Sequence, residues 1–126
     1  MSPAPAEYPS AMPYFILRDG PRFIDFLRRA FLGEQTLHIT DAEGYISHAE
    51  IQIGDSFIAF SESLERADLT RSAAILHVDD VDATYWRAME AGANSLQSPE
   101  HVDGVRHAEV IDWWGNRWRI APRTAP

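Results

Sequence analysis

The chain has 126 residues, of which 45% are hydrophobic and 24% charged, and its 19 acidic and 11 basic residues give a formal net charge of −8. This length and composition predict one globular domain and exclude architectures as large as a TIM barrel. There is no cysteine and every basic residue is arginine, which excludes disulfides, thiolate metal sites, cysteine nucleophiles and Schiff-base lysines.

Residues 1–11 predict a flexible N-terminal lead, because they lack the basic and apolar regions of a signal peptide. No later stretch is as apolar as a membrane span, which needs about 18 residues. The acidic balance disfavours nucleic acid, since a binder of nucleic acid needs a basic patch. We therefore expect a cytoplasmic protein with neither a membrane nor nucleic acid as a partner.

After the lead, the chain repeats itself at an offset of about 59 residues. The tripeptide His-Ala-Glu at 48–50 returns at 107–109, and Ile-Leu at 16–17 returns at 75–76. Two copies of this length indicate a duplicated supersecondary module, because solenoid arrays use shorter units in larger numbers.

The first copy, residues 12–63, predicts one strand, a helix and three further strands. Residues 12–18 form the short apolar strand, after which Asp19 and Pro21 can begin a helix that Gly33 ends. Apolar residues recur along this helix at helical spacing: Phe23, Leu27, Ala30 and Phe31. The three further strands are expected at 35–40, 45–53 and 56–61, with Gly54-Asp55 as the last turn.

Residues 64–72 read as a linker, and the second copy, residues 73–122, repeats the pattern. A strand at 73–78 precedes a helix that Asp79 or Asp80 caps and Gly92 closes. Its apolar stripe is Val81, Tyr85, Ala88 and Met89. Strands are expected at 105–111 and 116–121, with Gly115-Asn116 as the turn, and residues 95–104 are expected to form a polar loop over a cleft.

Three segments carry a family resemblance: PYFILRDGPRFIDFLRRAFLGE near the start, HAEIQIGDS in the middle and GNRW near the end. In this order they resemble the vicinal oxygen chelate superfamily, and within it the small glyoxalase/bleomycin-resistance-like proteins, over about residues 12–122. The resemblance implies an α+β fold of two tandem βαβββ modules, with a curved mixed sheet around a cleft and helices on the outside. It leaves the function open, because the superfamily includes lyases, epimerases, dioxygenases, thiol transferases and drug-binding proteins.

In metal-dependent members of this superfamily, the ligands come from the first and last strands of each module. By position they fall here on Met12, Ala59, Ala73 and Arg119. None of these is a usual ligand for a hard divalent cation, and an arginine repels one. We therefore expect the usual metal site to be absent, with no metal or other cofactor bound.

A histidine and a glutamate share one face of the middle strand in each copy: His48 with Glu50, and His107 with Glu109. Either pair could be a general base and the residue that orients it. The two pairs could also join in an unorthodox metal site. The favoured alternative is that they are polar linings of a pocket or of a dimer interface.

Trp113 and Trp114 occupy a turn where relatives carry a proline and a small or polar residue. Two large aromatic side chains at a turn are expected to cover a ligand or a partner subunit. Trp118 alternates to the helix face and is expected in the core.

Two further side chains are expected on the cleft face. Tyr14 alternates with the apolar residues of the first strand. Arg119 could bind a ligand carboxylate, or it could pair with Glu109 or Glu50, and the internal ion pair is favoured.

The leading functional hypothesis is a homodimeric, metal-independent protein that binds a small molecule and sequesters a cationic or aromatic drug-like ligand. Its predicted ligand-binding residues are Tyr14, His48, Glu50, His107, Glu109, Trp113, Trp114 and Arg119. The alternative is a metal-dependent lyase, isomerase or dioxygenase of the glyoxalase type at a relocated His/Glu site. Its catalytic candidates are His48, Glu50, His107 and Glu109.

Overall fold

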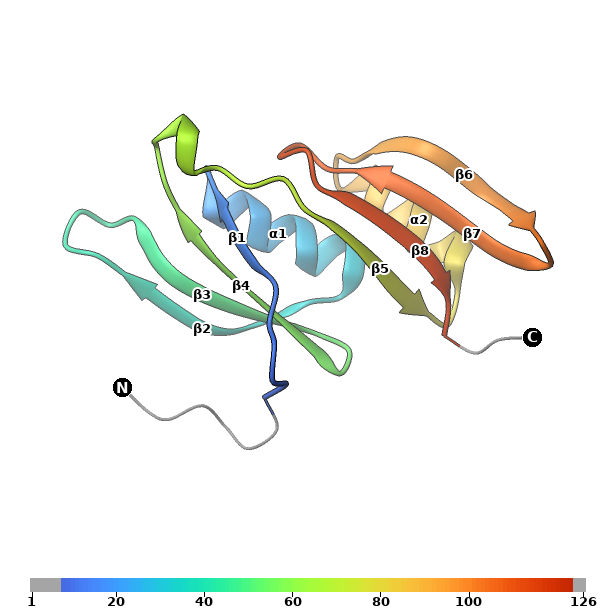
Figure 1. Cartoon of the computed structure of the whole chain (residues 1–126), viewed down its shortest axis with the longest axis horizontal. Helices are drawn as coiled ribbons and strands as arrows, with labels where there is room; N and C mark the ends of the chain where they lie inside the picture. The colour runs from blue at the N-terminus through green and yellow to red at the C-terminus, as the bar shows by residue number, and fades with distance from the viewer. Residues whose placement is uncertain (1–7, 124–126) are drawn as a thin grey trace.

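Two βαβββ modules, one after the other along the chain, form the structure (Figure 1). The computed structural model describes residues 8–123, so residues 1–7 of the predicted lead lie outside the described part. Each module has one four-stranded sheet and one helix, and both helices lie behind the sheets in the view of Figure 1. The two helices also contact each other, which joins the modules.

The first module has the element order predicted from its sequence. Its elements are β1 (Tyr14–Leu17), α1 (Gly20–Phe31), β2 (Glu34–Thr40), β3 (Ile46–Ile53) and β4 (Ser56–Glu62). The sheet order is β1-β4-β3-β2, in which β1 runs parallel to β4 and the other neighbours are antiparallel.

The second module repeats this arrangement. After a short 3₁₀ turn (Arg66–Asp68), its elements are β5 (Ala73–Val78), α2 (Val81–Glu90), β6 (Asn94–Val102), β7 (Val105–Ile111) and β8 (Arg117–Pro122). The sheet order is β5-β8-β7-β6, with β5 parallel to β8. The predicted α+β fold of two tandem βαβββ modules is therefore confirmed.

The two modules share one aromatic core between sheets and helices. Trp118 on β8 is 1% exposed, and its ring stacks on Phe15 of β1 at 5.9 Å and contacts Phe31 of α1 at 5.0 Å. The expected alternation on β3 is also observed, because Ala49 and Ile51 are buried in this core. One face of these strands is therefore packed in the core, and a binding site can form only on the opposite face.

The helix ends were predicted only in part. The Asp80 carboxylate accepts a hydrogen bond from Ala83 N at 3.0 Å and caps α2, as expected. Asp19 does not cap α1; the Glu62 carboxylate accepts the Gly20 N–H at 2.5 Å instead. At the other end of α1 the left-handed residue is Leu32 and not Gly33.

The prediction of a polar loop at residues 95–104 was wrong. These residues form most of β6, which pairs with β7 along its length. β6 is an edge strand with mostly exposed side chains, so no apolar alternation marks it in the sequence. Pro99 lies between the paired residues Gln97 and Glu100, where the register shifts, as edge strands allow.

Candidate functional site

The eight predicted ligand-binding residues lie in three separate groups. One group, on the first sheet, is Tyr14, His48 and Glu50; a second, on the second sheet, is His107, Glu109 and Arg119; the third is the turn pair Trp113 and Trp114. The structure therefore does not bring the two His/Glu pairs together within one chain.

The group on the first sheet is a hydrogen-bonded cluster centred on the buried Glu50. His48 Nε2 lies 2.9 Å from one Glu50 carboxylate oxygen, and the Tyr8 hydroxyl donates to the other. The Tyr14 ring lies 6.5 Å from the His48 ring, and its hydroxyl bonds to Ser61. Burial raises the pKa of Glu50, but the hydrogen bonds from Tyr8 and His48 outweigh it and hold this pKa below 4.5.

We expect the stabilisation from Glu50 to depend on pH. Because its pKa is lower in the folded state, the carboxylate stabilises the fold fully above its ordinary pKa of 4.5, and this contribution disappears as the pH falls through the folded-state pKa. Glu50→Gln should therefore cost about 1–3 kcal/mol near neutral pH and progressively less in acid. Urea denaturation of both proteins across pH measures this difference. Glu34→Gln on β2 is the exposed control, and a difference independent of pH would contradict the assignment.

In the group on the second sheet, the glutamate pairs with arginine and not with histidine. Glu109 accepts hydrogen bonds from Arg117 at 2.7 and 2.8 Å, and Arg119 lies 3.6 Å from its other oxygen. The predicted pairing of Arg119 with Glu109 is confirmed. His107 does not bond to Glu109, and within residues 8–123 its Nε2 is buried without a partner. The reason is geometric, because Arg119 lies directly across from Glu109 in the β7–β8 register.

The turn between β7 and β8 is built on a buried carboxylate that was not among the predicted residues. One oxygen of Asp112 accepts the backbone N–H groups of Trp114 and Asn116, each at 2.9 Å. The other accepts the Asn116 amide at 3.0 Å and the Trp118 indole N–H at 2.9 Å. Burial raises the pKa of Asp112, and these hydrogen bonds only partly offset it. Asp112 thereby holds the turn that carries the two indoles.

The two turn indoles have different environments. Trp114 packs edge-on against Phe23 of α1 at 5.0 Å, and its indole N–H donates to the Arg18 carbonyl at 2.6 Å. Trp113 is 56% exposed, with the Arg22 guanidinium 4.3 Å above its ring. Trp114 is therefore fixed by its own chain, whereas more than half of Trp113 is exposed beside the Arg22 guanidinium.

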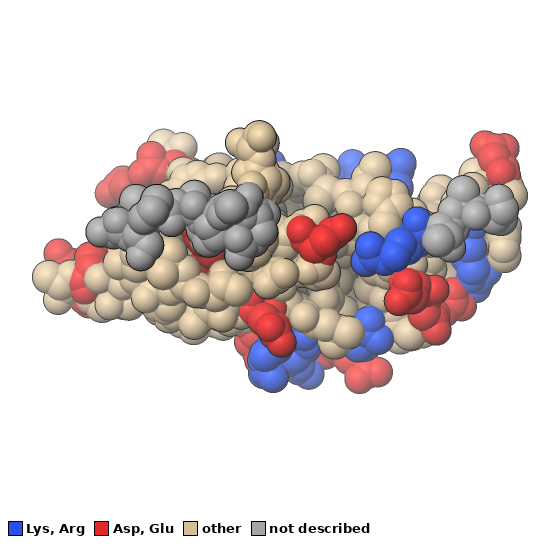
Figure 2. All heavy atoms as spheres, turned by 90° about the horizontal axis from the view of Figure 1, so that it is seen from below, with Lys and Arg blue, Asp and Glu red and all other residues tan. Residues whose placement is uncertain are grey.

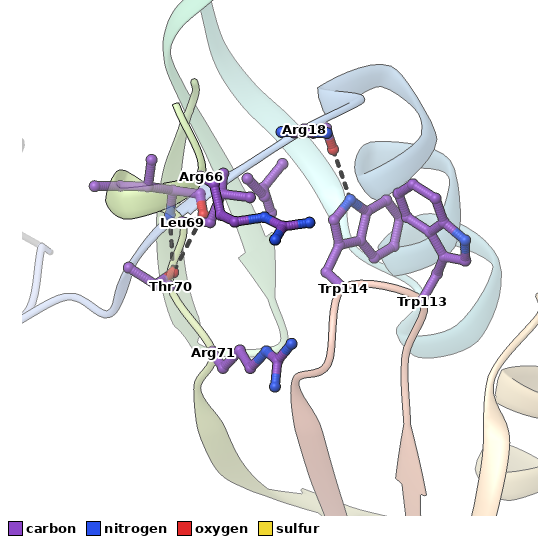
Figure 3. Close-up of a pocket in the computed structure, with 9 residues that line it drawn as sticks. Arg18, Arg66, Leu69, Thr70, Arg71, Trp113 and Trp114 are labelled. Atoms are coloured by element: carbon purple, nitrogen blue, oxygen red, sulfur yellow. Dashed lines mark hydrogen bonds between the residues drawn. The ribbon is translucent and has the colours of Figure 1, made fainter. Parts of the chain in front are cut away.

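A cavity of about 470 Å³ lies between this turn and the segment that connects the modules (Figure 3). We call it the indole pocket. Its lining includes the two turn indoles, the apolar side chains of Ile16, Leu17 and Leu69, and three arginines, Arg18, Arg66 and Arg71. In Figure 3, Arg66 and Arg71 extend from the connecting segment towards Trp114.

Sequence reasoning missed the connecting segment as part of a site. Residues 64–72 carry charges of both signs without apolar periodicity, and were interpreted only as a linker. Thr70 bonds to Ile16 of β1 through both backbone and side chain, which holds the segment against the first sheet. The sequence feature that could have indicated a site here is the presence of two arginines, Arg66 and Arg71, in a stretch of six residues within this segment.

Comparisons with solved structures place this arrangement among known folds. TioX from Micromonospora sp. ML1 is 26% identical, with a TM-score of 0.72 over 91% of this chain and 100% of TioX. The bleomycin resistance determinant of transposon Tn5 is 20% identical, with a TM-score of 0.65 over 93% of this chain and 99% of that one. A fosfomycin resistance protein from Mesorhizobium loti is 18% identical, with a TM-score of 0.68 over 92% of each chain.

The fold is that of the vicinal oxygen chelate superfamily. No protein-family model matches the chain. Among curated sequences, this chain is similar to uncharacterised proteins of Mycobacterium bovis and Mycobacterium tuberculosis. Each is 26% identical, covering 89% of this chain and 82% and 73% of the respective relatives. None of the described helices is long and apolar enough to cross a membrane.

The metal positions of the vicinal oxygen chelate superfamily do not fit a divalent cation in this chain. Of the four positions carried over from the resemblance, Met12 precedes β1 and Ala59 lies opposite Tyr14. Ala73 and Arg119 lie opposite Arg117 and Ile75. These positions offer no carboxylate or imidazole, and their arginines repel a cation.

The relocated metal site is not assembled within one protomer either. Over the described range 8–123, no group of three or more His, Asp or Glu side chains lies close enough to hold a metal. The His48–Glu50 pair and the His107–Glu109 pair instead lie on different sheets. We therefore derive no metal-dependent step for this chain.

Proposed function

We propose that the protein is a cytoplasmic, homodimeric, small-molecule-binding protein that holds an aromatic drug-like ligand without a metal. The observation that carries this proposal is the indole pocket. Its volume of about 470 Å³ falls within the roughly 300–1,000 Å³ usual for ligand sites. Its two indoles lie at 87° to each other, so a ligand ring can stack on the face of one and meet the edge of the other.

The exposed surface of Trp113 supports a binding role for the turn. A second cavity of about 240 Å³ lies along the other side of the indole pair, beside Arg22 and Phe26. An indole that is 56% exposed between two cavities loses unfavourable hydration when a ligand covers it. Trp114 is already packed against α1, so the indoles line the cavity without filling it.

We further propose that the purpose of binding is to sequester the ligand. Two of the structural neighbours are named as resistance proteins, one for bleomycin and one for fosfomycin. A protein that binds a drug tightly lowers its free concentration by mass action, and needs no catalytic group to do so.

A second copy of the chain is proposed as the partner of the open sheet faces. All seven residues of β2 are exposed, including the apolar Leu37 and Ile39. Ile75 on β5, in the other sheet, is likewise exposed, and exposed apolar side chains are commonly covered in an assembly. The absence of cysteine is compatible with a reducing compartment such as the cytoplasm.

Calorimetric and thermal-shift titration with 2-naphthamide, 2-naphthoate and bleomycin tests ligand binding. We expect at least one aromatic compound to bind and to raise the melting temperature, because a ligand at 100 times its Kd stabilises the fold by about 2.7 kcal/mol. Trp113→Ala should weaken this binding about tenfold, since stacking on the indole is lost. The matched control is Trp86→Ala on α2, because Trp86 is 57% exposed and lines neither of the two cavities.

Two results would contradict the proposal. One is the absence of binding by every aromatic compound in a broad panel. The other is stoichiometric Ni, Zn, Fe or Mn, found by elemental analysis of protein purified without chelators, that disappears in His48→Ala. Such a result would favour the metal-dependent enzyme.

A further inference from the structure

We propose that the ligand of the indole pocket is an anionic aromatic molecule, with its carboxylate held by Arg66 and Arg71 and its ring against the indoles. This inference rests on the proposed function and specifies its ligand class. It reverses the charge that the net charge of −8 had suggested for the ligand.

The first support is the distribution of paired and unpaired arginines. Six of the 11 arginines form ion pairs with carboxylates: Arg28, Arg29, Arg106, Arg117, Arg119 and Arg123. Among residues 8–123 the other five form none, and Arg18, Arg22, Arg66 and Arg71 of these five line the cavities beside the two indoles. Unpaired arginines are therefore concentrated at one place in an acidic chain.

Acidic side chains are abundant elsewhere on the surface. Figure 2 shows acidic and basic atoms side by side over much of one face, and acidic atoms alone towards its left-hand end. By contrast, no carboxylate is among the described residues that line the indole pocket. The local charge of the pocket is thus opposite in sign to that of the whole chain.

The second support is the geometry of the guanidinium groups. Arg18 donates to the Leu64 carbonyl at 3.2 Å, which leaves further N–H groups available. Arg66 and Arg71 have no side-chain hydrogen bond in the described part of the chain, and both extend into the pocket in Figure 3. A carboxylate accepts two parallel hydrogen bonds from one guanidinium, so these groups match an anion.

The turn itself supports the position of Arg71. Gly115 has φ = 88° at the β7–β8 turn, and a Cβ placed there would lie 3.3 Å from Cδ of Arg71. The Arg71 side chain, from Cγ to Nε, therefore packs closely against the backbone of the indole turn, at a position where it lines the pocket. Apolar contact along the stem leaves the charged end for a ligand.

Local charge outweighs net charge for a bound ligand. At physiological ionic strength, exposed charges farther away than the Debye length of about 8 Å are largely screened. The charged side chains on the wall of the pocket are three arginines, which repel a cation and attract an anion more strongly than the distant surface charges do.

Three naphthalene compounds that differ only in their charged group test the inference. They are 2-naphthoate, the neutral 2-naphthamide and 2-naphthylmethylammonium, each titrated calorimetrically into the full-length protein. We expect 2-naphthoate to bind at least about tenfold more tightly than the ammonium compound, and added salt to weaken the carboxylate most. Equal or tighter binding of the amide or the ammonium compound would overturn the inference.

Arginine variants locate the anion. Arg66→Gln and Arg71→Gln should each weaken 2-naphthoate about three- to tenfold and leave 2-naphthamide nearly unchanged. Arg28→Gln removes the same charge from the exposed face of α1 and serves as the control. If both pocket variants bind 2-naphthoate as the unmodified protein does, the carboxylate is not held by these arginines.

The outcomes separate this inference from the proposed function. Binding of all three compounds with similar affinity, weakened by Trp113→Ala, would retain the aromatic site and overturn the anion preference. If none of the three compounds binds, and no aromatic compound of the broad panel binds either, both the proposed function and the anion preference would be overturned. Preferential binding of 2-naphthoate that requires Arg66 and Arg71 supports both.

Discussion

Replacing Asp112 with alanine is expected to lower the free energy of unfolding by about 3 kcal/mol, because four buried or half-buried donors lose their acceptor at once. These donors are two backbone N–H groups, the Asn116 amide and the Trp118 indole. The same change should release the β7–β8 turn and weaken ligand binding, since that turn carries both indoles. Urea denaturation followed by circular dichroism measures the stability loss.

The chain contains a matched control for this substitution. Asp41 in the β2–β3 turn accepts the N–H groups two and four residues later, at 2.9 and 3.0 Å, as Asp112 does. Asp41 is exposed, so water can replace the lost acceptor, and Asp41→Ala should cost less than about 1 kcal/mol. Similar losses for both variants would show that the buried network around Asp112 contributes nothing beyond an ordinary turn.

Asp112 and Glu50 have opposite effects on the pH dependence of stability. The pKa of Asp112 is raised above 3.8 by burial, so the folded state holds its proton more tightly than the unfolded chain does. The contribution of this group therefore falls as the pH rises from 3.8 through its folded-state pKa, and is constant above it. The four hydrogen bonds that Asp112 accepts from the turn oppose this upward shift in pKa only in part.

Trp118→Ala is expected to lower the free energy of unfolding by about 3–5 kcal/mol, since it leaves a large cavity in the core that both modules share. Trp118 is 1% exposed and contacts Phe15 and Phe31 from the first module. The same urea experiment measures the loss, and Trp86→Ala is the exposed control, with an expected change of less than about 1 kcal/mol. A small effect of Trp118→Ala would mean that the modules do not depend on this shared core.

The losses in the free energy of unfolding caused by Trp118→Ala and Asp112→Ala should not be additive. The Trp118 indole N–H donates to Asp112 at 2.9 Å, so each single variant already breaks this bond. The double variant should therefore lose less than the sum of the two single variants, since neighbouring sites couple by about 0.5–3 kcal/mol.

The fold was predictable because its signals are local and repeated. The His-Ala-Glu tripeptide marks the same strand in both copies, and alternation around it placed Ala49 and Ile51 on the core side. The stripe of Phe23, Leu27 and Ala30 predicted α1, and these residues are buried. Each of these signals depends only on residues within one helix or strand, so each can be recognised from a short stretch of the sequence.

The site was only partly predictable, because its residues depend on contacts between distant segments. Trp113 and Trp114 were identified by their unusual place at a turn, but the pocket beside them is closed by Arg66 and Arg71 from the connecting segment. A pattern of mixed charges does not reveal which arginines lack a carboxylate partner. The pairing of Glu109 with arginine and not histidine likewise followed from the β7–β8 register.

The absence of cysteine and lysine limits the site chemistry to other side chains, and the duplicated module and the overall charge of −8 are likewise evident from the amino-acid sequence. Tertiary structure alone decided where charge is neutralised and where it is left free. Ion pairs form between side chains that the fold brings within a few ångströms, and this proximity is set by sheet register and module packing. For this reason an acidic chain presents a pocket lined by three arginines.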